Sequence, residues 1–289
     1  GNTIKRRADI AFAAAAGVTM FAFDSEAELT KLADVAPNTT VYCRVLVDGT
    51  GAEWPLGKKF GCADQMAEDL LIRAVELGFQ RPGISFHVGS QQTDLGAWDR
   101  CFGRARALID RLAARGVEIG LINLGGGFPS TMTRSKAQEP RQYAETVRAH
   151  ALRHFGDLNV HMIAEPGRGL VADAGCIVSE VVLVSEKGDG DDRRWVYLDI
   201  GKFSGLAETM DEAIRYRFET PDNGGPEGPV VIAGPSCDSA DVMYEKNAYS
   251  LPISLQEGDR VLILATGAYT TTYSSVGFNG FPPLDAVCL

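Results

Sequence analysis

The stretch IGLINLGGG (Ile119–Gly127) is a short apolar strand that leads directly into three consecutive glycines. Glycines after a buried strand expose successive backbone N–H groups with no side chains in the way, which forms a nest for an anion such as phosphate. A tight turn would use the same residues, so the triplet alone is ambiguous. The next apolar stretch ends in AEPGR (Ala164–Arg168), and an arginine at this point favours the phosphate-binding interpretation.

Outward from this stretch, apolar strands alternate with amphipathic helices as far as about residue 168. Strands are predicted at residues 18–24, 40–47, 83–89, 119–127 and 159–167, and helices at residues 4–16, 25–35, 64–77, 95–115 and 140–155. Ser25, with Glu28 three residues later, and Asp64 are expected to cap the second and third of these helices. This alternation indicates βαβ units and a parallel sheet. The sequence therefore predicts an α/β fold with five strands of a TIM-type β/α barrel.

The pattern changes after about residue 170. The β-rich segments CIVSEVVLVSEK, RRWVYLDIG, GPVVIAG and DRVLILATGAY are separated by turn-forming clusters such as GDGDD and PDNGGPEGP. A mostly antiparallel β domain is typical of such a pattern. We expect a barrel domain at residues 1–170 and a β domain at residues 171–289.

Composition excludes several classes of protein. The net charge of −10 and the pI near 5.0 leave no basic excess for nucleic acid or anionic membranes. The six cysteines are scattered without CxxC pairs or metal-ligand spacing, so we expect neither a disulfide framework nor a metal site, and a cytosolic location. The sequence contains no apolar run long enough for a transmembrane helix, so none is predicted. The first residues lack an initiator Met, and we expect them to come from the middle of a longer protein.

Chemically useful residues collect at one edge of the predicted sheet. Asp24, Arg44, His87, the glycine triplet and Glu165 stand where consecutive strands end. Parallel α/β folds build their sites at the carboxyl ends of strands. One polar strand end means little, because every strand leads into a loop, but five at one edge favour a ligand site.

Five motifs then resemble, in the same order, those of one enzyme family. They are FHVGS (Phe86–Ser90), NLGGGFP (Asn123–Pro129), AEPGR (Ala164–Arg168), GPSCDSAD (Gly234–Asp241), and GAYT with FNGF (Gly267–Thr270, Phe278–Phe281). The chain is similar along its whole length to the fold-type III decarboxylases of ornithine, lysine, diaminopimelate and arginine. This resemblance implies an alanine-racemase-like barrel, a C-terminal β domain and pyridoxal 5′-phosphate as cofactor.

The resemblance also implies roles for the cofactor-binding residues. His87 would stack on the pyridine ring, and Glu165, supported by Arg44, would pair with the ring nitrogen. The phosphate would be held by Ser90, Gly125, Gly126, Gly127, Arg168 and Tyr269. Taken singly, His87 could be a satisfied core histidine and Tyr269 a packing residue.

Other residues would act on the substrate. Cys237, reaching the site of a partner subunit, would return a proton, although a cysteine is often only a small buried hydrophobe. Asp211, Asp238 and Phe278 would contact the substrate, with Glu208 and Glu212 as neighbours that could share the acidic role. The alternative interpretation of Asp211, Glu208 and Glu212 is that they are solvated surface carboxylates.

An acidic pocket suits a diamino acid, so the resemblance favours decarboxylation of L-ornithine to putrescine in polyamine biosynthesis, or of L-lysine to cadaverine. The Cys-Asp-Ser order at Cys237 favours this activity over that of a diaminopimelate decarboxylase. A diaminopimelate- or carboxynorspermidine-type enzyme is the less favoured alternative. Lys59 and Asp241 match an intersubunit ion pair, which implies a homodimer with shared active sites.

One family element is missing from the sequence. The cofactor lysine of the family lies in a YAVKAN-like motif on the first barrel strand, and no lysine here stands in such a motif. The residues NTIKRR (Asn2–Arg7) resemble the stretch that follows the third barrel strand, so we expect the lysine upstream. A catalytically inactive, partner-binding regulator of the antizyme-inhibitor kind is the alternative, although such a protein need not keep the glycine, EPGR and Cys-Asp-Ser motifs.

Overall fold

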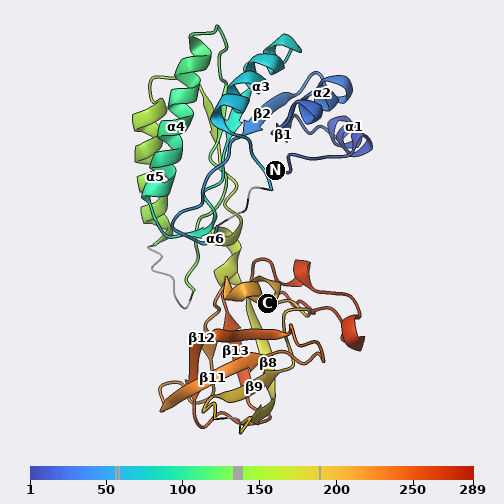
Figure 1. The fold of residues 1–289 in the computed structure, drawn as a ribbon, viewed down its shortest axis with the longest axis vertical. Helices are drawn as coiled ribbons and strands as arrows, with labels where there is room; N and C mark the ends of the chain where they lie inside the picture. The colour runs from blue at the N-terminus through green and yellow to red at the C-terminus, as the bar shows by residue number, and fades with distance from the viewer. Residues whose placement is uncertain (56, 58, 133–138, 189) are drawn as a thin grey trace. The chain divides into compact units, whose positions relative to one another are not determined.

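The computed structural model describes residues 1–289 except residues 56, 58, 133–138 and 189. The chain divides into two compact units (Figure 1). Of the described residues, the first unit holds Gly1–Pro129 and 139–167, and the second holds 130–132 and Arg168–Leu289. Among the described residues, no helix combines the length and apolar character needed to cross a membrane.

The first unit is built on a parallel sheet with the strand order β1-β2-β4-β6-β7. Its elements are α1 (Arg7–Ala15), β1 (Met20–Phe23), α2 (Glu26–Val35), β2 (Thr40–Arg44), β3 (Ala52–Trp54), α3 (Asp64–Glu76), β4 (Gly83–Ser85), β5 (Ser90–Gln92), α4 (Gly96–Ala113), β6 (Leu121–Asn123), α5 (Pro140–Phe155) and β7 (His161–Ile163). Strands β3 and β5 form a separate antiparallel pair. The prediction of five parallel strands of a partial barrel is confirmed, and in this chain the five strands form an open sheet.

Two of the helix starts show how local sequence sets the elements. The Oγ of Ser25 accepts a hydrogen bond from the N–H of Glu28 at 3.4 Å, as the predicted cap of α2 requires. The prediction that Asp64 caps α3 is wrong, because Ala63 occupies the cap position and Asp64 is the first helical residue. The Asp64 carboxylate instead pairs with Arg104 of α4 at 2.7 Å, which ties the two helices together.

The parallel strands are shorter than predicted. β4 ends at Ser85 and β6 at Asn123, because the chain bends there into the loops that carry His87 and the glycine triplet. Gly89 and Gly127 have φ values of 98° and 97°, which end the extended conformation soon after each strand. Asp24, His87, the glycine triplet and Glu165 therefore lie in loops beyond the sheet, while Arg44 is the last residue of β2.

The core of the first unit lies between the sheet and the long helices, and α4 and α5 lie side by side (Figure 1). Trp98 and Phe102 of α4 have no exposed surface, and Tyr143 and Phe155 of α5 are 1% and 3% exposed. The Phe102 ring meets the rings of Phe86 and Phe155 edge-on at centroid distances of 5.7 and 5.4 Å. Such contacts add to the hydrophobic stabilisation of a buried aromatic ring.

The second unit contains a six-stranded sheet with the order β10-β13-β8-β9-β11-β12. Its elements are α6 (Gly167–Val171), η1 (Ala172–Ala174), β8 (Cys176–Ser185), β9 (Arg194–Leu198), η2 (Ala207–Glu212), β10 (Phe218–Glu219), β11 (Glu227–Ala233), β12 (Val242–Pro252), β13 (Arg260–Leu264), η3 (Thr271–Tyr273) and η4 (Phe278–Gly280). The first residue of α6, Gly167, is the last residue of the first unit. Only β9 and β11 pair in parallel among the described strands of this sheet. The predicted, mostly antiparallel β domain is confirmed.

Phe102→Ala should lower the free energy of unfolding by about 3–5 kcal/mol, because it empties a fully buried site between α4, α5 and the loop after β4. Phe12→Ala is the matched control. Phe12 is 77% exposed on α1, so its loss should change stability by less than about 0.5 kcal/mol. Urea titration measures both, and equal destabilisation by the two substitutions would contradict this core assignment.

Candidate active site

The glycine triplet forms a turn in which backbone meets backbone. A Cβ at Gly125 would lie 2.2 Å from the carbonyl oxygen of Phe86, and one at Gly126 would lie 2.5 Å from the carbonyl oxygen of Glu165. A Cβ at Gly127 would lie 2.4 Å from the carbonyl oxygen of Gly89. Gly125 and Gly127 also have φ values of 66° and 97°, which disfavour other residues. Glycine is therefore required at all three positions to bring the loops after β4, β6 and β7 together.

Asn123 is a site residue that the sequence analysis quoted but did not assign. It ends β6 and is 1% exposed. Its Nδ2 donates to Glu165 Oε1 at 2.6 Å, and its Oδ1 accepts from the N–H of Gly125 at 3.0 Å. One amide thus positions the carboxylate and the start of the glycine turn together. An asparagine closing a buried strand was the available signal, because a buried amide requires polar partners.

Glu165 presents a charged carboxylate at this edge, and its side chain is 41% exposed. Burial raises the pKa of the Glu165 carboxyl, while the hydrogen bond from Asn123 and the charge of His87 act to lower it. Burial lowers the pKa of Arg44, and the nearby negative charges of Glu165 and Asp24 raise it by a smaller amount, so the net pKa is lowered.

His87 lies beside Glu165 and the glycine turn, on the loop after β4. Burial, followed by the positive charge of Arg44, lowers the pKa of His87 to about 4. The imidazole is therefore neutral at neutral pH. Its Nδ1 accepts from the N–H of Gly89 at 3.1 Å, which leaves the proton of the neutral ring on Nε2. A neutral ring that is fixed in this way is suited to stacking on an aromatic ligand rather than to ion pairing.

In the second unit, Arg168 forms a buried ion pair that sequence did not predict. Arg168 is 3% exposed and Glu208 is 4% exposed. Nη2 of Arg168 lies 2.6 Å from both carboxylate oxygens of Glu208. The guanidinium carbon lies 5.1 Å from the centre of the Tyr269 ring, so the structure brings together two of the residues predicted to bind phosphate. The carboxylate of Glu208 is committed to Arg168, which argues against its suggested share in substrate binding.

Asp241 organises the loops around Cys237. It is 3% exposed, and its carboxylate accepts from the N–H of Lys202 at 2.8 Å and from the N–H and Oγ of Ser236 at 3.1 and 2.7 Å. A Cβ at Gly201 or at Gly234 would lie less than 2.5 Å from this carboxylate. The structure thus shows an internal role for Asp241, and its predicted ion pair with Lys59 of a second subunit stays a prediction. Nζ of Lys59 lies 5.2 Å from the ring centre of Phe60.

The predicted catalytic cysteine is exposed. The thiol of Cys237 donates to Oδ1 of Asn279 at 3.3 Å, and the adjacent Phe278 ring lies 4.4 Å from the ring of Phe203. The structure therefore places Cys237 next to the FNGF segment. Asp238 is exposed, and its Oδ1 caps its own turn by accepting from the N–H of Ala240 at 2.8 Å. Cys237 is therefore not a small buried hydrophobic residue.

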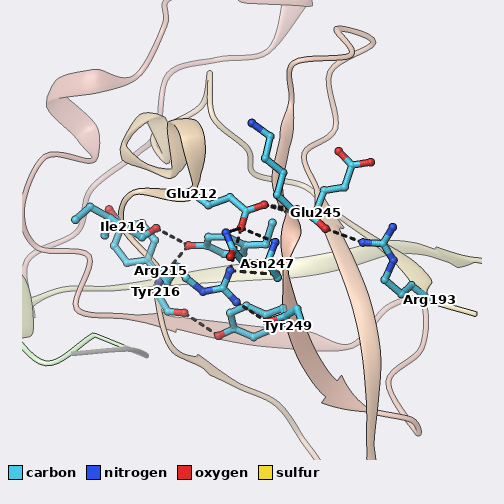
Figure 2. Close-up of polar contacts among 11 residues, drawn as sticks. Arg193, Glu212, Ile214, Arg215, Tyr216, Glu245, Asn247 and Tyr249 are labelled. Carbon is cyan, nitrogen blue, oxygen red and sulfur yellow. Dashed lines mark hydrogen bonds and ion pairs between the residues drawn. The ribbon is translucent and has the colours of Figure 1, made fainter. Parts of the chain in front are cut away.

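Adjacent acids on η2 lie in opposite environments. The Asp211 side chain is 89% exposed and lies 3.7 Å from Nζ of Lys246. The Glu212 side chain is 5% exposed and points toward the backbone of β12 (Figure 2). It accepts from the N–H groups of residues 245, 246 and 247 at 2.7, 2.5 and 3.0 Å. Asp211 is thus accessible as predicted, while Glu212 is a structural carboxylate.

Arg215, which precedes β10, extends this network to the backbone of β12 (Figure 2). Its Nη1 lies 3.1 Å from Glu212, and its two terminal nitrogens donate to the carbonyl oxygens of Asn247 and Ala248 at 3.2 and 2.8 Å. The hydroxyl of Tyr249 donates to the carbonyl oxygen of Tyr216 at 2.7 Å. Side chains thereby occupy backbone groups on the side of β12 away from β11, where the described residues supply no further strand, and this protects that edge.

Ser90 lies in β5, where it pairs with Trp54 of β3. The role of its hydroxyl at the phosphate stays a prediction. The cysteines are free thiols, and the Sγ atoms of the buried Cys43 and Cys62 lie 3.6 Å apart.

Known proteins are similar to this chain over most of its length. Residues 1–172 match the family described as "Pyridoxal-dependent decarboxylase, pyridoxal binding domain". The chain is 31% identical over 280 residues to the lysine/ornithine decarboxylase of Selenomonas ruminantium, covering 97% of this chain and 69% of that protein. It is also 31% identical over 295 residues to antizyme inhibitor 2 of Xenopus laevis, covering 97% of this chain and 63% of that protein. The chain thus spans about two thirds of the length of these curated relatives.

Solved structures show the same fold. The lysine/ornithine decarboxylase of Vibrio vulnificus, solved with cadaverine, has a TM-score of 0.84 and 31% identity, over 100% of this chain and 74% of that one. A mutant of SrLDC, solved with PLP, has a TM-score of 0.83 and 30% identity, over 98% of this chain and 71% of that one.

Glu212→Gln should lower the free energy of unfolding by about 3 kcal/mol, because it leaves the buried Arg215 without its counter-charge and places an amide against backbone donors. Burial raises the pKa of Glu212, but its backbone and Asn247 hydrogen bonds lower it more. The stabilisation by this carboxylate is therefore present above its unfolded pKa and is lost as the pH falls through its folded pKa.

Asp211→Asn is the matched control, since it neutralises the adjacent exposed acid and keeps a residue that tolerates φ of 52°. Its stability should change by less than about 0.5 kcal/mol. Urea titrations at neutral and acidic pH measure both variants. Equal effects at neutral pH, or a Glu212→Gln deficit that does not shrink in acid, would contradict the structural role of Glu212.

Proposed function

Because the chain belongs to the fold-type III pyridoxal-phosphate decarboxylases of the ornithine and lysine decarboxylase family, we propose that its protein decarboxylates L-ornithine and also accepts L-lysine. The observation that carries this proposal is the first-unit cluster of Glu165, neutral His87 and the glycine turn, joined by Asn123. A regulator that does not bind cofactor has no need for this combination.

The residues present fit the cofactor. A carboxylate fixed by the Asn123 amide suits a protonated pyridine nitrogen. A neutral imidazole suits the face of an aromatic ring. The glycine turn leaves no side chain over its backbone, as an anion nest requires. Ser90, Arg168 and Tyr269 keep their predicted role as phosphate-binding residues.

The bound cofactor supplies an electron sink for the electron pair left when the substrate carboxylate departs as CO2. Glu165 would keep a proton on the ring nitrogen, and Arg44 would hold Glu165 in its charged form through its positive charge. Asn123 would hold the carboxylate in place through its hydrogen bond to Oε1. Glu165 and Arg44 would thus act through their charges, and Asn123 would act by positioning Glu165.

Cys237 would return the proton to the substrate carbon in the site of a second copy of the chain. Its thiol is exposed and lies at the FNGF segment, which supports such an action in trans. Asp238 and Asp211 are exposed carboxylates that would attract the distal ammonium group of a diamino acid. Phe278 would line the same region. The Vibrio vulnificus relative was solved with the diamines cadaverine and putrescine, which supports this substrate class.

The first test uses the protein in its natural full length, with pyridoxal phosphate added and CO2 release measured from L-ornithine, L-lysine, L-arginine and meso-diaminopimelate. We expect turnover of ornithine or lysine, and at least about a hundredfold loss in Glu165→Ala, because removing a charge-stabilising group costs several kcal/mol. Absence of both cofactor binding and turnover would favour a regulator like the related antizyme inhibitor. Turnover of diaminopimelate alone would reject the assignment to ornithine and lysine in favour of the diaminopimelate-type alternative.

Cys237→Ala should slow product formation by at least about tenfold, because proton transfer by a positioned acid contributes typically a hundredfold or more. Cys288→Ala is the control, since Cys288 is also exposed but lies outside the motifs. Amine product is quantified by chromatography beside CO2 release, because misdirected protonation would separate the two. Full putrescine formation by Cys237→Ala would reject the assignment of this thiol as the acid.

A further inference from the structure

The buried pair of Arg168 and Glu208 has a geometry that an accidental contact would not produce. A single nitrogen, Nη2, lies 2.6 Å from both oxygens of the carboxylate, and both side chains are nearly inaccessible. A guanidinium carries its donors in one rigid plane. Fixing Nη2 on a buried carboxylate therefore restricts the direction of the whole group.

Aromatic side chains enclose the pair. The ring of Tyr269 lies 5.1 Å from the guanidinium carbon, and the ring of Tyr273 lies 6.1 Å from that of Tyr269. Burial first, and then the charge of Glu208, raises the pKa of both Tyr216 and Tyr273, so these side chains also lie in the field of the pair. In such surroundings charge interactions are screened less than in water.

Stability alone does not explain the pair. Burying two charges costs several kcal/mol per ion, and well-packed apolar residues often replace such a pair without loss. Burial raises the pKa of Glu208 in spite of the opposing effect of Arg168, so the carboxylate is in an unfavourable environment. A function for the ionised pair, beyond holding the fold, is the simpler reason for its presence.

We propose that Glu208 is a positioning residue that acts through Arg168, orienting its guanidinium for the phosphate group of the cofactor. This inference rests on the proposed function, since it takes Arg168 as a phosphate ligand. Glu208 itself contacts neither substrate nor cofactor. Its removal should therefore weaken binding only of ligands that carry the phosphate.

The test compares pyridoxal 5′-phosphate with pyridoxal, which lacks the phosphate, at equilibrium on the full-length protein. Wild type, Glu208→Gln, Arg168→Ala and the double variant form a cycle. We expect Glu208→Gln to weaken the phosphate form at least tenfold, or about 1.4 kcal/mol, and pyridoxal less than twofold. In the Arg168→Ala background, Glu208→Gln should have no further effect on the ratio of the two affinities.

The ratio of affinities controls for partial unfolding, because misfolded protein binds neither ligand. Glu208→Asp, which keeps the charge but shortens the side chain, should recover part of the ratio. Parallel losses of both ligands would show a purely structural role and overturn the proposal. Tighter binding of the phosphate form by Glu208→Gln would overturn it as well, because Glu208 would then be a competitor of the phosphate.

Two outcomes separate this inference from the proposed function. Wild-type protein that binds neither form of pyridoxal would reject the proposed function. Wild-type protein that prefers the phosphate form, with no coupling between Glu208 and Arg168 in the cycle, would leave the proposed function standing and reject the positioning role alone.

Discussion

Direct contact between backbones at the carboxyl edge of the parallel sheet is the constraint on which the candidate site depends. The loops after β4, β6 and β7 approach so closely that a single Cβ at Gly125, Gly126 or Gly127 would overlap a neighbouring carbonyl oxygen. The N–H of Glu165 also donates to the carbonyl oxygen of Gly125 at 2.8 Å. Glu165 and the anion nest are therefore held by the same contacts, and a change in one loop displaces the others.

The second unit uses buried carboxylates for the same purpose. Glu208 fixes Arg168, Glu212 fixes Arg215 and the edge of β12, and Asp241 fixes the loops around Cys237. Glu208 and Glu212 are paired with arginines inside the protein, and Asp241 is held by hydrogen bonds. The exposed Asp211 and Asp238 therefore remain the carboxylates that are proposed to attract the substrate ammonium group.

Sequence predicted the architecture well because hydrophobic period and glycine position are local signals. The alternation around IGLINLGGG sufficed for the parallel sheet, and the grouping of His87, the glycines and Glu165 followed from the rule for strand ends. Strand lengths were overestimated, since the extended pattern continues into loops that lie beyond the hydrogen-bonded ladder. The partners of Glu208 and Asp241 could not be predicted, because residues far apart in the chain provide them. Asn123 was missed, although its position at the end of a buried strand was visible.

The turn that carries Asp211 and Glu212 makes this part of the chain sensitive to length. Both residues have left-handed backbone conformations, with φ of 52° and 55°, yet one side chain faces solvent and the other lies inside the β domain. Inserting or deleting one residue between Leu206 and Arg215 would exchange their places and bury the wrong acid. Evolution can therefore vary the residue types here more easily than the spacing, and homologous sequences should align across this turn without gaps.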